Sequence, residues 1–331
     1  MGGDLGPRPC VCAAEKFAML HPEVKIVLFG SEAAIRKALT CSAALAHSLQ
    51  IVDVPDYVHM HDSPGMALRR KRNSSMWHAL QALAESRAEA CVSAGNTGAL
   101  MAMGRHIVKT LPGINRPAIG KYIPTRREPS LLLDLGANLS CSAEMLYQFA
   151  CMGAALARAN GVAVPKLALL NVGSELSKGN DAVRGAAKLI HARQHRIPVN
   201  FQGFVEGDEL YSGSIDVIVC DGFAGNVALK VSEGLVRHLT ASLEDYINAR
   251  WFTRAARVLM RPLLSSWAQK RNPALSNGAA FLGLQKTVIK SHGSADIPGL
   301  FAALEAAREQ ILAQTPSKIA ASMASLETQM E

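Results

Sequence analysis

The chain has 331 residues, of which 49% are hydrophobic and 19% are charged, so it can bury a sizeable core and is not disordered. Its formal net charge of +8 favours an acidic partner: a nucleic acid, an anionic membrane surface or an acidic protein. No apolar run approaches the ~20 residues that span a bilayer, and the N-terminus has no signal-peptide pattern. We therefore expect a soluble protein.

The seven cysteines are spaced irregularly, and they form no CxxC pair or His/Cys cluster with zinc spacing. Several lie in apolar runs, where cysteine behaves as a small buried hydrophobic residue. Their odd number and irregular spacing favour a reducing compartment, so we expect a cytoplasmic protein without a metal site.

Short apolar runs alternate with helix-like segments, and a glycine-rich turn joins each pair. Five such runs occupy residues 24–30, 90–95, 131–136, 167–173 and 216–222. This alternation indicates an α/β fold whose mostly parallel sheet is covered by helices on both faces, and we expect the whole chain to form one catalytic domain. Ligands bind beyond the carboxyl ends of such strands, so we expect the glycine-rich turns to share one functional edge.

Several familiar catalytic motifs are missing from the chain. It has no GxxxxGKS/T phosphate loop, no GxGxxG after a strand, no GxSxG elbow and no HExxH pair. ATP hydrolysis, conventional NAD binding, serine hydrolysis and zinc proteolysis are therefore disfavoured. What is left is a set of Gly/Asn/Ser turns that open helices, where backbone N–H groups can bind an anion.

The turn at residues 93–98 combines small residues, two glycines and hydroxyl groups, which suits a phosphate or an oxyanion. Its candidate ligands are Ser93, Gly95, Asn96 and Thr97. A tight turn in which Asn96 or Thr97 caps the following helix would have the same composition.

A second turn contains Gly173, Lys178 and Asn180. A lysine beside a glycine-rich turn can neutralise a phosphate or polarise a carbonyl group. The alternative is an exposed surface lysine without a function, which is the usual situation of lysine.

Two further turns carry polar side chains at strand ends. Asp221 ends a buried run and precedes Gly225 and Asn226, whose amide could donate a hydrogen bond to an oxyanion or simply cap the next helix. Ser291 and His292 occupy the last turn, where the histidine could transfer protons near neutral pH. A lone histidine is, however, more often structural than catalytic.

These turns belong to nine segments that occur in order along nearly the whole chain. The segments are MGGDLGP at 1–7, LRRKRNSSM at 68–76, CVSAGNTGALMA at 91–102, GINRPA at 113–118, LLDLGANLSC at 132–141, LLNVGSELSKGN at 169–180, CDGFAGNVALKVSEG at 220–234, NGAAFLGL at 277–284 and VIKSHGSAD at 288–296. In this order they resemble the acyl-ACP:phosphate acyltransferases of bacterial phospholipid synthesis. The resemblance implies an α/β/α sandwich related to phosphotransacetylases and isocitrate-dehydrogenase-like enzymes, working as a homodimer, and it adds Asn138 to the substrate-binding candidates.

The start of the chain departs from the family pattern. In the family, a short apolar strand ending in aspartate precedes the MGGD motif, whereas here Met1 stands at the methionine of that motif. We expect that the true start lies upstream, because loss of a central strand would uncover backbone groups and apolar surface.

The reaction implied by the resemblance moves a fatty acyl group from acyl carrier protein (ACP) to inorganic phosphate, giving acyl-phosphate for glycerol-3-phosphate acylation. Phosphate is already an anionic nucleophile and a thioester has a good leaving group, so the reaction needs no metal, cofactor or covalent intermediate. We assign phosphate binding to the 93–98 turn with Lys178, thioester orientation or oxyanion stabilisation to Asn226, and protonation of the leaving thiolate to His292.

Residues 240–275 break the alternation of strands and helices and are expected to form a helical excursion. Arg250, Arg254, Arg257 and Arg261 fall on one face of a helical wheel, and apolar residues form a broad stripe on the other side. Such a helix suits an anionic membrane surface or acidic ACP, so we expect peripheral association with the inner face of the cell membrane. A helix that packs in a dimer is the alternative.

Other functions fit part of this pattern. A phosphotransacetylase-like enzyme that uses acyl-CoA would have similar anion-binding turns, and a non-catalytic anion-binding module would need no more than these turns. The chain contains no helix-turn-helix, zinc or RNA-binding signature, so we expect no nucleic-acid partner despite its positive charge.

Overall fold

The structure is a computed structural model that describes residues 2–40, 48–194, 198–248 and 277–327. Its helices are α1 (Pro7–Leu20), α2 (Glu32–Ala38), α3 (Pro64–Arg70), α4 (Ser75–Ala84), α5 (Thr97–Ile107), α6 (Ala143–Ala159), α7 (Asp181–Ala192), α8 (Gly222–Asn248), α10 (Ile297–Leu312) and α11 (Thr315–Glu327), with a short 3-10 helix at Gly207–Glu209. Its strands are β1 (Ile26–Gly30), β2 (Leu49–Asp53), β3 (Ala90–Ser93), β4 (Ala118–Ile123), β5 (Ser130–Leu133), β6 (Lys166–Leu170), β7 (Asn200–Val205), β8 (Val217–Val219), β9 (Ala279–Leu282) and β10 (Thr287–Lys290).

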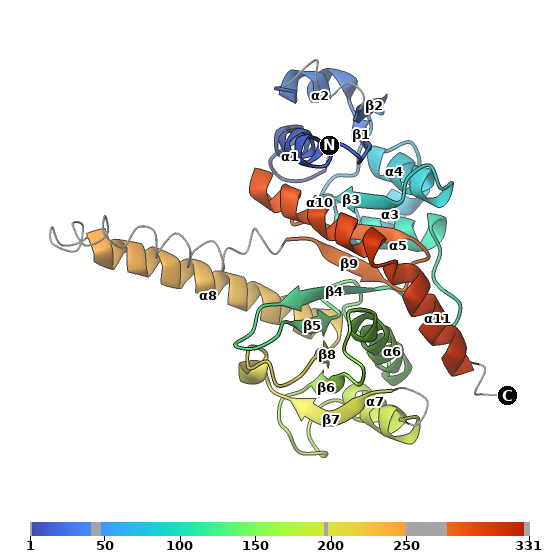
Figure 1. The fold of residues 1–331 in the computed structure, drawn as a ribbon, viewed down its shortest axis with the longest axis vertical. Helices are drawn as coiled ribbons and strands as arrows, with labels where there is room; N and C mark the ends of the chain where they lie inside the picture. The colour runs from blue at the N-terminus through green and yellow to red at the C-terminus, as the bar shows by residue number, and fades with distance from the viewer. Residues whose placement is uncertain (1, 41–47, 195–197, 249–276, 328–331) are drawn as a thin grey trace.

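Eight of these strands form one mixed sheet in the order β3-β10-β9-β4-β5-β8-β6-β7. The β3–β10 pair and the β5–β8–β6–β7 group are parallel, whereas β9 pairs antiparallel with both β10 and β4, and β4 pairs antiparallel with β5. Strands β1 and β2 form a separate parallel pair beside α1 and α2 (Figure 1). The predicted α/β fold with a mostly parallel sheet is confirmed.

The antiparallel strands β9 and β4 reverse the direction of the sheet between its two halves. Strands β3 and β10 consequently run opposite to β5, β8 and β6. The carboxyl ends of these two groups of strands therefore lie at opposite edges of the sheet. The expectation that all glycine-rich turns share one edge is therefore wrong. The alternation of apolar runs and helices does not predict the strands at residues 118–123 and 279–282, whose antiparallel pairing reverses the sheet.

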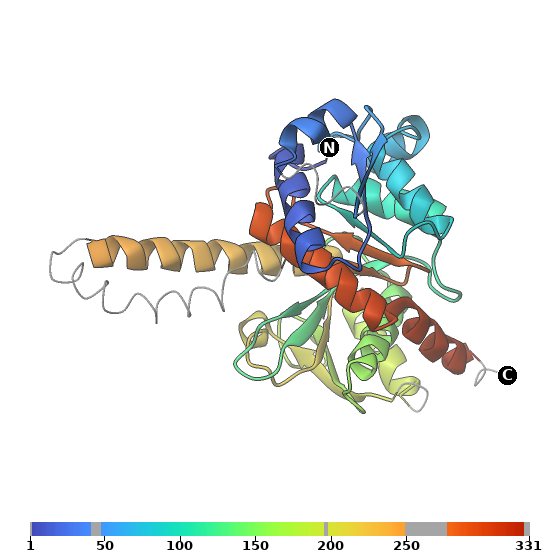
Figure 2. The ribbon, with the colours of Figure 1, turned by 45° about the horizontal axis from the view of Figure 1, so that its top comes forward.

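Two layers of helices cover the sheet and give the α/β/α arrangement visible in Figures 1 and 2. On one face, Leu80 of α4 and Leu100 of α5 pack with the start of α8 against strand residues such as Val288. On the other face, α6, α7 and α11 form a second core, and α10 packs on β3 and β10. A Cβ on Gly153 of α6 would lie 2.6 Å from Val217 Cγ1, so this glycine allows α6 to approach β8 closely.

Helix α8 has 27 residues, and its distal part projects away from the sheet in both views (Figures 1 and 2). It begins at Gly222, so the segment that the sequence assigned to a turn before Asn226 is helical, and that boundary is wrong. Asp221 caps the helix, because its Oδ1 accepts a hydrogen bond from Ala224 N at 2.8 Å. A Cβ on Gly222 would lie 2.6 Å from Asn138 O, so only glycine allows this start to pack against the turn after β5.

The predicted helical excursion at 240–275 begins within α8. Its residues 249–276, including the four arginines of the predicted basic face, lie outside the described residues. The division of the chain into domains therefore stays a prediction. Among the residues that the structure describes, no helix is both long and apolar enough to cross a bilayer.

Candidate active site

The turns that follow β3 and β10 lie side by side. Ser93 and Lys290 are paired at the ends of these two parallel strands. Ser291 N donates a hydrogen bond of 2.9 Å to Ser93 O, and Ser93 Oγ accepts one of 3.2 Å from Gly95 N. The 93–98 turn and the turn that contains His292 therefore form one contiguous surface.

The N-terminal loop packs against both of these turns. Asp4 N donates a hydrogen bond of 2.8 Å to Gly293 O, and Gly3 adopts a φ of 111°. A Cβ on Gly2 would lie 2.8 Å from Gly95 Cα, so a larger residue would separate the loop from the 93–98 turn. The two glycines allow the loop to bring the Asp4 carboxylate to the end of β10.

Helix α8 reaches the same surface from the other half of the sheet. Lys230 Nζ lies 2.6 Å from His292 Nε2 and 3.0 Å from Glu233 Oε2. The Lys230 ammonium can only donate, so in the neutral ring Nε2 accepts from it, and Nδ1 can donate to Ser294 Oγ at 2.8 Å. Burial and the charge of Lys230 lower the pKa of His292.

Asn226 lies exposed on α8 four residues before Lys230, and the helical repeat places both on one face, one turn apart. A Cβ on Gly136 would lie 3.5 Å from the Cβ of Asn226, so Asn226 stands beside the turn after β5. The first two turns of α8 therefore connect Asn226 with His292, although the strands that lead to them run in opposite directions.

Two further lysines are partly buried next to this group. Burial lowers the pKa of Lys290 to about 8 and also lowers the pKa of Lys121, which lies in the middle of β4. The positive charge of Lys230 lowers both pKa values further, whereas Asp4 opposes the shift at Lys290 and Glu233 opposes it at Lys121.

Sequence reasoning did not select Lys121, Lys230 or Lys290 as site residues. The signal at Lys121 is a lysine inside an otherwise apolar strand, AIGKYI. Such a residue indicates either an edge position or a functional site, and β4 lies in the middle of the sheet. For Lys230 and Lys290, only the packing of α8 against the sheet shows that the two residues belong to one group.

The turn after β5 is organised by Asp134, which is fully buried. Its carboxylate accepts hydrogen bonds from Ile119 N at 2.9 Å, Ala137 N at 3.0 Å and Asn138 N at 2.7 Å. Burial raises the pKa of Asp134, and these hydrogen bonds oppose that shift. Asn138 is also buried; its Nδ2 donates to Pro117 O and to Asp134, so its amide nitrogen braces the turn.

The turn after β6 holds Lys178 on the protein surface. Asn171 Nδ2 donates to Gly173 O at 3.1 Å and to Lys178 O at 3.2 Å, and Asn180 Oδ1 caps α7 by accepting from Val183 N at 2.9 Å. Within the described part of the chain, no hydrogen bond or ion pair joins the Lys178 side chain to the 93–98 turn or to α8. The structure thus brings Asn226 and His292 onto one surface. The turn that holds Lys178 follows β6, the parallel neighbour of β8, so it lies at the same edge of the sheet as the start of α8.

Several predicted ligands hold the turns in place. Asn96 caps α5, because its Oδ1 accepts from Ala99 N at 3.0 Å, and its Nδ2 donates to Met60 O and Asp62 O, both at 2.9 Å. Ser291 is fully buried, and its Oγ accepts from Asn277 Nδ2 at 2.6 Å. The capping alternative considered for Asn96 is thus confirmed. The remaining candidates in these turns are Thr97, the first residue of α5, Asp221, the cap of α8, and Gly225, inside the first turns of α8.

The chain is similar over nearly its whole length to known proteins. A family model described as "Fatty acid synthesis protein" matches residues 1–318. The chain belongs to this family. The phosphate acyltransferase of Saccharophagus degradans is 52% identical to it over 326 residues, which cover 98% of this chain and 94% of that protein. The phosphate acyltransferase of Teredinibacter turnerae is 49% identical over 320 residues, covering 97% and 96%. The resemblance inferred from the nine segments is confirmed.

Solved structures share the fold of this fatty acid synthesis protein. A phosphotransacetylase from Streptococcus pyogenes has a TM-score of 0.62 at 16% identity, covering 93% of this chain and 92% of that chain. A branched-chain phosphotransacylase from Enterococcus faecalis has a TM-score of 0.59 at 14% identity, covering 94% and 96%. At these identities the similarity shows the fold alone, and it confirms the predicted phosphotransacetylase-like architecture.

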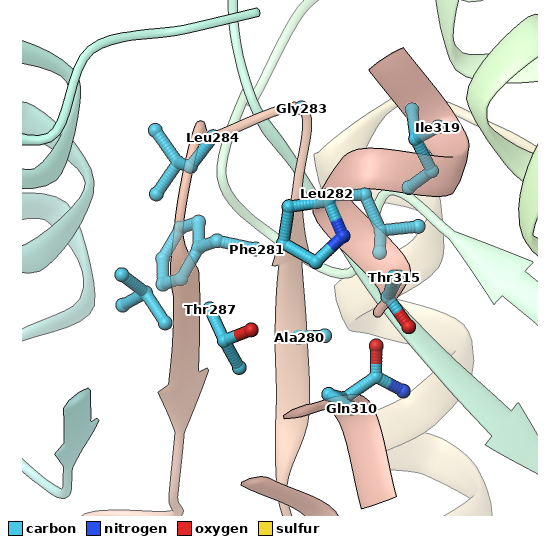
Figure 3. A pocket seen from close by; sticks show the side chains of 11 residues that line it. Ala280, Phe281, Leu282, Gly283, Leu284, Thr287, Gln310, Thr315 and Ile319 are labelled. Atoms are coloured by element: carbon cyan, nitrogen blue, oxygen red, sulfur yellow. The ribbon is translucent and has the colours of Figure 1, made fainter. Parts of the chain in front are cut away.

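A small pocket of the same molecule lies at the other end of β10 (Figure 3). The β9–β10 hairpin, the last turn of α10 and the first turns of α11 line it. Phe281, Leu282, Thr287 and Ile319 are among the lining side chains. No charged side chain lines this pocket, so it does not suit an anion. In the described ranges, no group of three or more His, Cys, Asp or Glu residues is placed to hold a metal ion.

Proposed function

We propose that the surface formed by the β3 and β10 turns and the start of α8 transfers a fatty acyl group from the ACP thioester to inorganic phosphate. The observation that carries the reaction class is the near full-length similarity to phosphate acyltransferases, 52% identity over 98% of the chain. The enzyme is a phosphate acyltransferase of fatty acid and phospholipid synthesis. The identity of the donor, the roles of individual residues and the assembly of the protein are our proposals.

In the proposed reaction a phosphate oxygen attacks the thioester carbonyl carbon, and the C–S bond of the tetrahedral intermediate breaks to give acyl-phosphate and a thiolate. Asn226 is exposed at the start of α8, where its Nδ2 can donate a hydrogen bond to the developing oxyanion. The phosphate is held at the 93–98 turn with help from a lysine, for which the sequence favours Lys178. The protein thus supplies orientation and charge stabilisation.

The leaving thiolate takes a proton from the pair formed by His292 and Lys230. The Lys230 ammonium gives this proton to the thiolate and becomes a neutral amine, and His292 Nε2, at 2.6 Å, positions it by accepting a hydrogen bond from it. The lowered pKa of His292 keeps its ring mostly neutral at pH 7, which makes the neighbouring ammonium the proton reservoir.

The decisive experiment mixes the protein with acyl-ACP and phosphate and traps acyl-phosphate with hydroxylamine. We expect Asn226→Ala to lower kcat by about 10²–10³-fold, as loss of one oxyanion donor does elsewhere, and Lys178→Ala to raise the KM for phosphate. Circular dichroism verifies that both variants fold. Near-parental rates in folded variants would remove these residues from the mechanism. Competition between acyl-ACP and acyl-CoA in the same assay separates this function from that of a phosphotransacetylase.

We also propose that the protein is a homodimer and that it associates with the membrane peripherally. The dimer is supported by an exposed apolar stripe along the projecting α8, which includes Val231, Leu235 and Leu239. Membrane association is supported by the basic amphipathic pattern at residues 250–261, which lies outside the described residues.

A further inference from the structure

Strand pairing places two lysines in one row across the middle of the sheet. Lys290 of β10 is paired with Ser93 of β3 on one side and with Ala279 of β9 on the other. The β4–β9 register, extended by one residue, places Lys121 opposite Ala279. Paired residues project from the same face of a sheet, so these four side chains form a row on the face that α8 covers.

The spacing within this row puts both lysines within reach of one small anion. Neighbouring strands lie about 4.8 Å apart, so the Cα atoms of Lys121 and Lys290 are separated by about 10 Å. Ala279, which lies between them, has only a methyl side chain. Both lysine side chains are long enough to reach an anion bound above that methyl group.

Helix α8 supplies a third cation above the row. Lys230 Nζ lies 2.6 Å from Nε2 of His292, which follows Lys290 by two residues, and its charge contributes to the lowered pKa of both Lys121 and Lys290. Its own position is fixed by Glu233 at 3.0 Å and by His292 at 2.6 Å. Three lysines from separate elements therefore converge on one small volume.

The charges of this group are not balanced within the described residues. Asp4 and Glu233 are the nearby carboxylates, and Glu233 is already paired with Lys230. In the part of the chain that the structure describes, Lys121 forms no ion pair or side-chain hydrogen bond, and the Lys290 ammonium donates only to the backbone oxygen of Ser291. A partly buried cation without a counter-charge lowers the stability of the folded protein, and a bound anion would offset this loss.

We infer that Lys121, Lys230 and Lys290 form the site that binds the acceptor phosphate, with the 93–98 turn at one end of the row. The inference rests on the proposed function and specifies it, because it replaces exposed Lys178 as the main phosphate ligand. A doubly charged tetrahedral anion offers several oxygens to cations that approach from different directions. Asn226 stands one helical turn from Lys230, so a thioester carbonyl held there would lie next to the bound phosphate.

Two sources could supply such an anion: free inorganic phosphate or the phosphodiester of the phosphopantetheine arm on the donor. We assign free phosphate, because all its oxygens can accept from lysines that approach from different directions, whereas two oxygens of a phosphodiester are esterified. The kinetic constants for the two substrates separate these sources.

The test measures acyl-phosphate formation as a function of phosphate concentration at saturating acyl-ACP. We expect Lys121→Met and Lys290→Met each to lower kcat/KM for phosphate by about 10–100-fold, the usual effect of losing one charged hydrogen bond. The KM for acyl-ACP should stay within about twofold of the parental value, since the carrier is recognised elsewhere. Lys290→Arg should recover part of the loss, and Lys188→Met, at an exposed position on α7, should match the parent.

A second measurement does not depend on activity. Inorganic phosphate should raise the Tm of the parent protein relative to chloride at equal ionic strength, and the Lys121→Met/Lys290→Met double variant should lose this stabilisation. Such a loss supports the phosphate site whatever the outcome of the activity assay. If the parent forms no trapped acyl-phosphate, that result refutes only the proposed function.

The inference is overturned if the folded double variant keeps both the parental kcat/KM for phosphate and the parental stabilisation by phosphate. It is equally overturned if the KM for acyl-ACP rises in these variants while kcat/KM for phosphate is unchanged. The cluster would then bind the phosphodiester of the donor.

Discussion

Burial of the Lys290 ammonium lowers the stability of the folded chain, and the same burial prepares this residue to bind an anion. Lys290 ends a strand whose preceding residues, Thr287 to Ile289, are buried, and burial is the main reason why its pKa is lowered. The charged form is therefore less stable in the folded protein than in the unfolded chain. Asp4 compensates for this only in part, because the charge of Lys230 acts in the opposite direction.

Replacing Lys290 by methionine should stabilise the protein in phosphate-free buffer. We expect the free energy of unfolding at pH 7 to rise by an amount on the order of 1–3 kcal/mol, because methionine keeps most of the apolar stem and removes the charge. The ordinary lysine pKa is 10.5 and the folded pKa is about 8. Between these values the unfolded chain binds more protons than the folded chain, so parental stability rises with pH there.

Thermal or denaturant unfolding of both proteins from pH 7 to pH 10.5 measures this effect. The advantage of Lys290→Met should be largest below pH 8 and should shrink as the pH rises, since the parental lysine then becomes neutral. A variant that is less stable than the parent at pH 7, or a difference that does not change with pH, would contradict the assigned burial cost.

Helix α8 has two functions at the scale of a single element. One side of its first three turns carries Asn226, Lys230 and Glu233 toward the candidate active site. Another side presents apolar residues at intervals of four, and Val231 and Leu239 are 64% and 57% exposed. An apolar stripe on a helix that projects from the body favours burial against a second copy of the chain.

Placing charges in this stripe should prevent dimerisation. We expect Leu235→Glu combined with Leu239→Glu to raise the dimer dissociation constant by about 30-fold or more, because each carboxylate would be buried in the interface. Sedimentation equilibrium over a range of protein concentrations measures the constant. Ala241→Glu adds a charge at an exposed position of α8 outside the stripe and serves as the control. A parent that stays monomeric at all concentrations would refute the dimer.

At the scale of the whole molecule, the excess of positive charge is divided between two regions. Three lysines converge at the candidate phosphate site, and four arginines at residues 250–261 form the predicted basic face of the excursion. The first region suits a small anion within reach of α8. The second suits an extended acidic surface, such as an anionic bilayer or ACP.

Reversing the charge of Arg250, Arg254, Arg257 and Arg261 should weaken binding to anionic vesicles or to ACP. Turnover of a short carrier-free thioester should not change, because that substrate requires only the active site. Vesicle co-sedimentation and steady-state rates with both donors provide the two measurements. Equal loss of activity with the carrier-free thioester would show instead that the segment supports the catalytic fold.

The sequence by itself determined the family, the alternation of strands and helices, and the Asn96 cap of α5. These features depend on residues that are close in the chain: Asn96 caps the helix that begins at the next residue. The Asn226 cap that it also offered is wrong, because Asp221 caps α8. Asn226 and His292 could be selected as candidates because each belongs to a short segment that matches the family.

Only the tertiary structure decided how the two halves of the sheet are joined and which cations meet. Strands β4 and β9 reverse the sheet, and they bring Lys121 and Lys290 to either side of Ala279 although 169 residues separate the two lysines along the chain. The register of such a pairing follows from long-range packing, since any local window of sequence fits several partners equally well. The physical reason is that local sequence specifies an element and its ends, whereas the face on which distant side chains converge is specified by pairing across the sheet.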